Sequence, residues 1–401
     1  MSGSARPFAA RRQRRDRSWG LGLAIGIGAG VVIGLIGRRA DEVARRGLVD
    51  WREAEAIAAR RLRAAPGTLH PAELAASEPA WSAIMERIVP VLEARLGQPL
   101  PGIVGRHAVV DRAGWAAANL VIFRDLFDRL EPALVGPLGA SRPPGAAVAA
   151  LANRFIATQQ LGYLLGFLGL RVLGQYDMAI LSAEAAPGRL LFVEENIRGL
   201  ARQLDVPLGD MRTWIALHET THAFEFEAHP WLRPYLAERV ERLLAALLED
   251  AQALRVRGLP ELLRRVRRTD GDVFAGLLGA EQRRLLRETR VAMSLLEGFS
   301  DWVMDQVGGE LVRDVATVRA RFEARRAAPR RGLDALIARL SGLDLKLEQY
   351  RRGERFVSGV VAIAGVDAVG WLWSGVEALP SEVELADPAA WLRRMGRAAA
   401  A

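Results

Sequence analysis

Residues 214–224 of the chain read Trp214-Ile215-Ala216-Leu217-His218-Glu219-Thr220-Thr221-His222-Ala223-Phe224. The two histidines are four residues apart, so on an α-helix both imidazoles point to one side, one turn apart, where they can share a zinc ion. Glu219 projects beside that ion, where its carboxylate can take a proton from a zinc-bound water and generate the hydroxide that attacks a carbonyl. The stretch therefore predicts a zinc-binding helix with His218 and His222 as ligands and Glu219 as catalytic base.

A solvent-exposed helix that carries two unrelated histidines and a glutamate is the alternative interpretation. Apolar residues precede the motif, uncharged threonines fill its middle, and Ala223 and Phe224 follow it. These flanks are too apolar for a solvated face. An accidental H-E-x-x-H among so few histidines is also rare, below roughly one chance in a hundred. We therefore expect a buried helix built around a metal.

A hydrolytic zinc site needs a third protein ligand and leaves one position open. His229 follows His222 by seven residues, whereas the extended H-E-x-x-H-x-x-G-x-x-H pattern requires six with a glycine between them. His229 is therefore predicted to be a loop residue beside Pro230. Glu225 lies on the same rigid helix and would not close a tetrahedron. The third ligand has to come from another helix.

The stretch from Ser294 to Asp301, Ser-Leu-Leu-Glu-Gly-Phe-Ser-Asp, offers such a ligand. Glu297 and Asp301 lie one helical turn apart on one face, among apolar neighbours that argue against a solvated acidic face. We expect Glu297 to bind the zinc and Asp301 to accept the outer N–H of a zinc histidine, which fixes the orientation of that ring.

The composition limits the other kinds of site. The 401 residues include no cysteine, so thiolate zinc sites and cysteine nucleophiles are excluded, and a metal must rest on His, Asp or Glu. The net charge of +8 is concentrated in residues 1–17, where six arginines stand against Asp16 and leave only +3 for the rest of the chain. Phosphate-backbone binding is thus at most a property of this tail, and we expect no nucleic-acid partner.

Residues 19–37 form an uncharged apolar stretch that is long enough to cross a bilayer core as a helix. Small residues recur at every fourth position on one face of it, a pattern that lets membrane helices pack closely and self-associate; they are Gly22, Gly26, Gly30 and Gly34. A soluble or interfacial segment is the alternative, because seven glycines weaken the hydrophobicity of this helix.

Two regions follow from this organisation. Residues 1–48 are predicted to be an Arg-rich tail and an N-terminal transmembrane helix, and residues 49–401 a single hydrolase domain. Arginines flank the apolar stretch on both sides, so the positive-inside rule leaves the side of the membrane that holds the domain open.

Helical periodicity dominates the chain from Val49 onward. Apolar residues recur three and four apart in residues 51–63, 79–96, 118–134, 232–254, 281–307 and 333–350. A second apolar run, residues 155–170, is too short for a bilayer and carries Gln159 and Gln160, so we predict a buried helix there. Residues 134–145 and 323–332 are predicted loops.

The clearest strand signal is Arg189-Leu-Leu-Phe-Val-Glu194, which follows Pro187-Gly188. The sequence thus predicts a mainly helical α+β domain with a small β-sheet. We hypothesise that residues 189–194 form the sheet edge that binds an extended substrate by strand addition.

Further motifs resemble one known family. They are Val49-Asp50-Trp51, Asp111-Arg-Ala-Gly-Trp115 with Asn119, Leu173-Gly-Gln-Tyr-Asp177, Leu217 to His222, Pro230-Trp-Leu-Arg233, Leu295-Leu-Glu-Gly298 with Asp301 and Met304-Asp305, Gln349-Tyr350 through Gly353 to Phe356-Val357, and Leu379-Pro380 through Asp387-Pro388 to Trp391. With them the chain resembles the zincin clan, in its branch with a glutamate third ligand, and more narrowly the zinicin-like metallopeptidase type 2 family, also called coenzyme F420 biosynthesis-associated.

This resemblance runs from about residue 49 to the C terminus. It implies a zincin-like fold and a zinc peptidase, with His218, His222 and Glu297 as ligands and Glu219 as base. We carry over no F420 ligand, since that label indicates genomic association. The family resemblance identifies no residue that stabilises the transition state. Tyr176 and Tyr235 are the candidates for this role in the chain.

The sequence therefore predicts a zinc-dependent metallohydrolase that acts as a peptidase on a peptide or protein substrate, held at the membrane by its N-terminal helix. A noncatalytic zinc-containing binding or scaffold protein is the competing class. Glu219 favours the enzyme, because a purely structural zinc site has no use for a base and usually closes all four positions.

Overall fold

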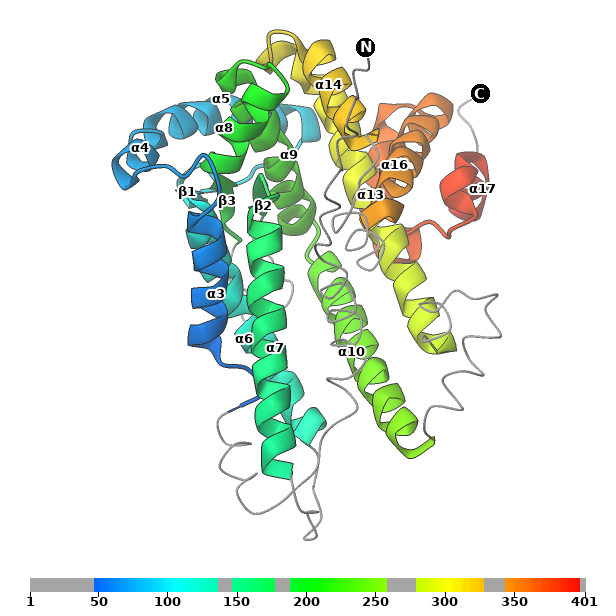
Figure 1. The fold of residues 1–401 in the computed structure, drawn as a ribbon. Helices are drawn as coiled ribbons and strands as arrows, with labels where there is room; N and C mark the ends of the chain where they lie inside the picture. The colour runs from blue at the N-terminus through cyan, green and yellow to red at the C-terminus, as the bar shows by residue number, and fades with distance from the viewer. Residues whose placement is uncertain (1–46, 136–145, 177–187, 258–278, 328–342, 397–401) are drawn as a thin grey trace, which may run out of the picture.

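The computed structural model describes residues 47–135, 146–176, 188–257, 279–327 and 343–396 (Figure 1). Helices dominate this part of the chain, as the periodicity predicts. They are α3 (Trp51–Arg63), α4 (Pro71–Ala75), α5 (Glu78–Leu96), α6 (Arg112–Val135), α7 (Ala146–Gly169), α8 (Glu194–Gln203), α9 (Leu208–Ala228), α10 (Leu232–Arg257), α13 (Ala280–Leu311), α14 (Val315–Ala327), α16 (Leu343–Ala364) and α17 (Pro388–Arg394).

Short 3-10 helices connect some of these elements, and three strands form one small sheet. The 3-10 helices are η1 (Val104–Arg106), η3 (Val366–Trp373), η4 (Val376–Ala378) and η5 (Glu384–Ala386). The strands are β1 (His107–Val110), β2 (Gly174–Tyr176) and β3 (Leu190–Val193), in the order β1-β3-β2. The fold is therefore α+β and mainly α-helical, which confirms the predicted class.

The central strand β3 is parallel to β1 and antiparallel to β2. Leu190 pairs with His107 on one side and with Tyr176 on the other. All four residues of β3 are buried, because successive side chains point to opposite faces and both faces are covered by helices. Our hypothesis that residues 189–194 form the sheet edge is therefore wrong, since β2 and β1 lie at the two edges.

The two faces of the sheet belong to two hydrophobic clusters. Phe192 stacks on Trp81 of α5, with ring centroids 4.1 Å apart, and lies in the cluster that also contains residues of α9, α13 and α16. Its neighbour Leu191 lies in the second cluster, with Trp115 of α6 and Leu165 of α7. The strand thus ties the two helical layers together, and α9 lies in the layer that contacts α13.

Helix α9, which carries the histidine motif, begins at Leu208 and ends at Ala228. His229 is its C-cap residue, and Pro230 cannot continue the helix because it lacks a backbone N–H. Most of the helix is buried all round, which agrees with the apolar flanks of the motif.

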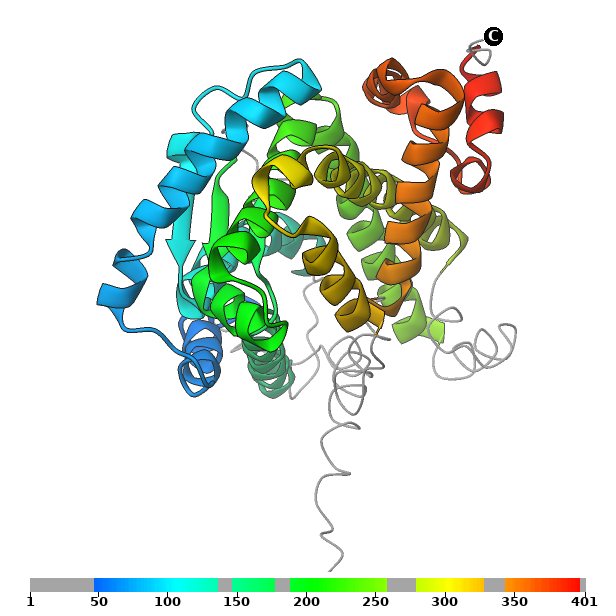
Figure 2. The same cartoon turned by 90° about the horizontal axis from the view of Figure 1, so that it is seen from above.

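Helices α13 and α16 cross at unusually short range through two glycines. A Cβ on Gly353 of α16 would collide with the backbone carbonyl of Ser294, and a Cβ on Gly298 would collide with the backbone of Gly353. Only residues without a side chain allow this approach. Glu297 therefore lies on a helix whose position is fixed by the crossing. Figure 2 shows α16 and the C-terminal elements on the side of the molecule opposite to α3 and α5.

Helices lie where the sequence predicts them, but α6 and α7 begin several residues before the predicted positions. α3 spans the predicted residues 51–63. The apolar run 155–170 lies in α7, a helix packed on α3, but it is only partly buried, because Phe155, Tyr163 and Leu164 are exposed. The loop predicted for residues 323–332 is wrong as far as Ala327, because α14 continues to that residue. Residues 136–145 and 328–342 lie outside the described residues.

No helix within the described ranges is both long and apolar enough to span a bilayer. The predicted transmembrane segment, residues 19–37 with its four regularly spaced glycines, lies outside the described residues and stays a prediction.

Candidate metal centre

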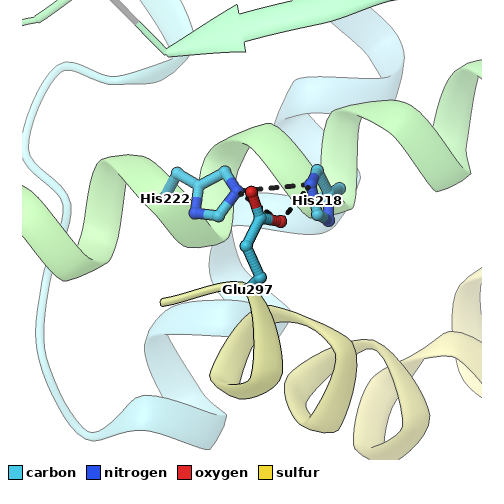
Figure 3. A group of neighbouring side chains, drawn as sticks. All are labelled: His218, His222 and Glu297. Atoms are coloured by element: carbon cyan, nitrogen blue, oxygen red, sulfur yellow. Dashed lines mark hydrogen bonds and ion pairs between the residues drawn. The ribbon is translucent and has the colours of Figure 1, made fainter. Parts of the chain in front are cut away.

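His218 and His222 lie one turn apart on α9, with their Nε2 atoms 3.2 Å from each other. Glu297 approaches from α13, and its Oε2 lies 3.6 Å from the Nε2 of His218 and 3.8 Å from that of His222 (Figure 3). One ligand atom from each of the three residues lies within 4.8 Å of the others. Two helices far apart in the sequence thus bring together the three predicted ligands.

The surroundings of this cluster fit a metal ion. Oε2 of Glu297 is buried and has no hydrogen-bond partner in the described part of the chain. A buried carboxylate oxygen without a partner is costly unless a cation satisfies it. Two imidazole nitrogens and a carboxylate oxygen are a donor set that suits zinc and leaves a fourth position for water or substrate.

The outer nitrogens of both histidines are held by hydrogen bonds. Nδ1 of His222 lies 2.7 Å from Oε2 of Glu225, and Nδ1 of His218 lies 2.9 Å from Oγ of Ser300. Such partners fix the ring orientation and leave Nε2 toward the metal. Glu225 and Ser300 were not predicted for this role. Glu225, three residues after His222, could have been found from the helix period, but the contact of Ser300 depends on how two helices pack.

Asp301 follows Ser300 on α13. Burial lowers the pKa of Arg319, but Glu323, Glu354 and Asp301 outweigh that effect and raise it. Asp301 thus contributes negative charge around Arg319. That it orients a zinc histidine stays a prediction.

Glu219, the predicted base, is held by strand β2. The backbone N–H of Tyr176 donates to Oε2 of Glu219 at 3.1 Å. A Cβ on Gly174 would lie 2.6 Å from Cγ of Glu219, so only glycine leaves room for this carboxylate. Burial raises the pKa of Glu219 to about 7, with the charge of Glu297 adding to the shift. A carboxylate of this kind is poised to exchange protons near neutral pH.

The electrostatics of the cluster favour a cation. Burial lowers the pKa of His222, but the carboxylates of Glu225, Glu297 and Glu219 outweigh it and raise that pKa to about 10. Burial likewise raises the pKa of Glu225 to about 7. Three carboxylates around two imidazoles therefore create a negative potential that a bound divalent ion would neutralise.

His229 lies outside the ligand cluster, as predicted from its spacing. Its ring stacks on Trp373 with centroids 4.9 Å apart and meets Phe224 edge-on. Its Nε2 is buried and has no hydrogen-bond partner in the described part of the chain, and burial lowers its pKa to about 4. His229 is thus a neutral ring in an aromatic cluster.

The two candidate tyrosines are engaged elsewhere. The hydroxyl of Tyr176 donates to Oε1 of Glu227 at 2.9 Å, and Arg106 holds both carboxylate oxygens of Glu227 at 2.8 Å. The guanidinium group of Arg239 lies over the ring of Tyr235, with Cζ of Arg239 3.4 Å from the ring centroid. What Tyr176 supplies to the centre is therefore its backbone N–H.

Two histidines one turn apart, a glutamate from a second helix and a further glutamate next to them in the sequence are the arrangement expected of a His-His-Glu metal centre. The chain belongs to the family of zincin-like metallopeptidases, whose sequence profile matches residues 49–392. This confirms the family resemblance, and membership places the chain among metal-dependent hydrolases.

A solved structure supports the same assignment. The chain is similar to a protein from Chloroflexus aurantiacus described as "a putative hydrolase with a novel fold", with 34% sequence identity and a TM-score of 0.63. The alignment covers 87% of this chain and 99% of that one. None of the curated proteins matches the chain.

Proposed function

We propose that the protein is a zinc-dependent hydrolase that cleaves peptide bonds and uses Glu219 as its base. The observation that carries the proposal is the convergence of His218, His222 and Glu297, with Glu219 adjacent to the ligands and pinned by Tyr176. A peptide or protein is the proposed substrate, and attachment to a membrane through residues 19–37 is proposed on the sequence alone.

His218, His222 and Glu297 would hold the zinc ion. Zinc bound there would lower the pKa of a water molecule and polarise the carbonyl of the scissile bond. Glu219 would accept the proton of this water molecule as its oxygen attacks the carbonyl carbon. Because the N–H of Tyr176 occupies Oε2 of Glu219, the other oxygen, Oε1, is the proposed acceptor. The same carboxyl group then returns the proton to the leaving amine.

Ser300 and Glu225 support this chemistry by keeping the imidazoles oriented. Each holds the outer nitrogen of one histidine, so both Nε2 atoms stay directed at the ion. The raised pKa of Glu219, about 7, lets one group act first as base and then as acid near neutral pH.

The test combines metal analysis with a peptidase assay. We expect wild type, Glu219→Gln and the control Glu310→Gln, an exposed position on α13, to bind equal amounts of zinc. On a library of fluorescence-quenched peptides, Glu219→Gln should lose about 10²–10⁴-fold in rate, because general-base catalysis contributes that much. Glu310→Gln should keep the wild-type rate.

Two outcomes would contradict the proposal. Hydrolysis by Glu219→Gln at the wild-type rate would show that Glu219 is not the catalytic base. A wild-type protein that binds zinc and cleaves no member of the library would favour the noncatalytic scaffold.

A further inference from the structure

The N-terminal half of α7 carries two exposed apolar side chains that lie one helical turn apart. Phe155 is 64% exposed and Leu151, one turn before it, is 48% exposed. Large apolar residues gathered on one face of a soluble domain mark a site of contact with another molecule or with a membrane. We call Leu151 and Phe155 the α7 tip.

The α7 tip continues the face of α7 that packs on α3. Leu151 precedes Gly162 by eleven residues, and Phe155 precedes Gly166 by eleven, which is about three helical turns in each case. Gly162 lies against Ile57 of α3, and a Cβ there would be 2.7 Å from the Cβ of Ile57. Helix α3 thus covers the upper part of this face, and in Figure 1 α7 extends beyond the beginning of α3.

The chain enters α3 from the side of the α7 tip. The carbonyl of Gly47 accepts a hydrogen bond from Arg154 at 3.1 Å, and Asp50 forms an ion pair with the same arginine at 2.9 Å. The N–H of Asp50 donates to Oγ1 of Thr158 at 2.8 Å. Because α3 then runs parallel to α7, with Ile57 beside Gly162 and Arg61 beside Gly166, Gly47 lies at the end of this face that α3 leaves uncovered.

The sequence before Gly47 brings a lipid surface within reach of this end. The apolar stretch 19–37 is followed by only nine residues, 38–46, before Gly47. Nine residues span at most about 30 Å even when fully extended. Residues 38–46 carry four arginines against Asp41 and Glu42, a surplus of positive charge that suits anionic headgroups.

We propose that the α7 tip lies in the interface of the anionic membrane into which residues 19–37 insert. Phe155 and Leu151 enter the boundary between headgroups and acyl chains, where amphipathic surfaces bury their apolar residues. This second contact restricts how the domain tumbles above the bilayer. The inference rests on the predicted membrane segment and on the exposure of the tip, and it is independent of the metal chemistry.

The absence of cysteine in the natural chain makes a direct test possible. We would make the single-cysteine variants Phe155→Cys and Leu151→Cys in the full chain and label them with a nitrobenzoxadiazole fluorophore. Val383→Cys is the matched control, because Val383 is an apolar residue that is 77% exposed near the C terminus. Each protein would be reconstituted into vesicles of phosphatidylcholine with phosphatidylglycerol.

We expect a doxyl-labelled lipid to quench most of the fluorescence at positions 151 and 155, while aqueous iodide quenches position 383 several-fold more strongly. Labels at 151 and 155 that iodide reaches as well as the control would overturn the proposal. Labels that are protected from iodide and untouched by the lipid quencher would also overturn it, since another part of the chain would then cover the tip.

Discussion

Gly174 in strand β2 lies directly against the side chain of Glu219, the proposed base. Gly174 leaves the space that the carboxylate of Glu219 occupies, and the N–H of Tyr176 two residues later binds the same carboxylate. The proposed base is thus positioned by the backbone of β2.

Gly174→Ala should therefore move Glu219 and slow hydrolysis. The new Cβ would lie 2.6 Å from Cγ of Glu219, and displacement of a catalytic group by about 1 Å can cost about a hundredfold in rate. Zinc content should not change, because Glu219 is no ligand. Gly199→Ala on α8, where nothing lies within 4 Å of the new Cβ, is the control that should keep full activity. Equal rates for the two variants would show that β2 does not position the base.

His229 should make the stability of the protein depend on pH. Its pKa is about 4 in the folded state, against about 6.5 in the unfolded chain. Between these values the unfolded chain binds more protons, so the free energy of unfolding falls as pH drops from 6.5 toward 4, by up to about 1.4 kcal/mol per unit. His229→Phe keeps a ring against Trp373 and should show a shallower slope in urea denaturation over this range. Parallel curves for wild type and variant would contradict the prediction.

Sequence reasoning could predict the residues whose spacing carries chemistry. His218, His222 and Glu219 follow from one helical motif, and Glu297 from a second acidic helix in apolar surroundings. Ser300 and Gly174 could not be found in this way. Their roles depend on contacts between elements that are tens of residues apart in the sequence, and those contacts are set by packing.

The close crossing of α13 and α16 fixes the position of the helix that carries Glu297. Gly298, next to that ligand, lies directly against Gly353, and the two backbones touch. A side chain at either position would push α13 away from its neighbours.

Gly353→Ala should therefore weaken both the fold and the metal site. Forcing a methyl group into a packed contact costs about 1–3 kcal/mol of unfolding free energy, and the shift of α13 should also lower zinc affinity. Gly309→Ala, on the same α13 in open space, should be neutral or stabilise by up to about 1 kcal/mol, because alanine favours helix. Thermal unfolding and chelator competition measure the two effects. If both variants behaved alike, the close crossing would have no role in the site.

The long helices were easier to predict from sequence than the sheet. A helix such as α3 repeats its apolar pattern over 13 residues, whereas β2 has only three residues and no room to show a period. The apolar run of β3 predicts a strand, which the structure confirms. The prediction that this strand lies at the edge of the sheet is wrong, because β3 is the central strand. Its four consecutive buried residues are typical of a central strand covered on both faces.

A metal ion held by His218, His222 and Glu297 would join α9 to α13. These helices come from separate parts of the chain, and both contribute to the larger hydrophobic cluster. An ion that binds only the folded arrangement stabilises it by mass action, by about 2.7 kcal/mol at a free concentration a hundredfold above Kd.

Removal of the metal should consequently lower the melting temperature. We expect treatment with EDTA to reduce the Tm of wild type by several degrees and to leave the Tm of His222→Ala unchanged, since that variant has lost a ligand. Restoring zinc should recover the wild-type Tm. A wild-type Tm that does not respond to EDTA or zinc would argue against a metal that links the two helices.

His218, His222 and Glu297 are proposed to bind one metal ion together. Anomalous diffraction from crystals of the protein, measured on both sides of the zinc absorption edge, tests this most directly. We predict a single anomalous peak about 2.0–2.2 Å from Nε2 of each histidine and from a carboxylate oxygen of Glu297, present only above the edge. The absence of a peak between these three residues in zinc-loaded crystals, or a peak on other ligands, would show that they do not form the metal site.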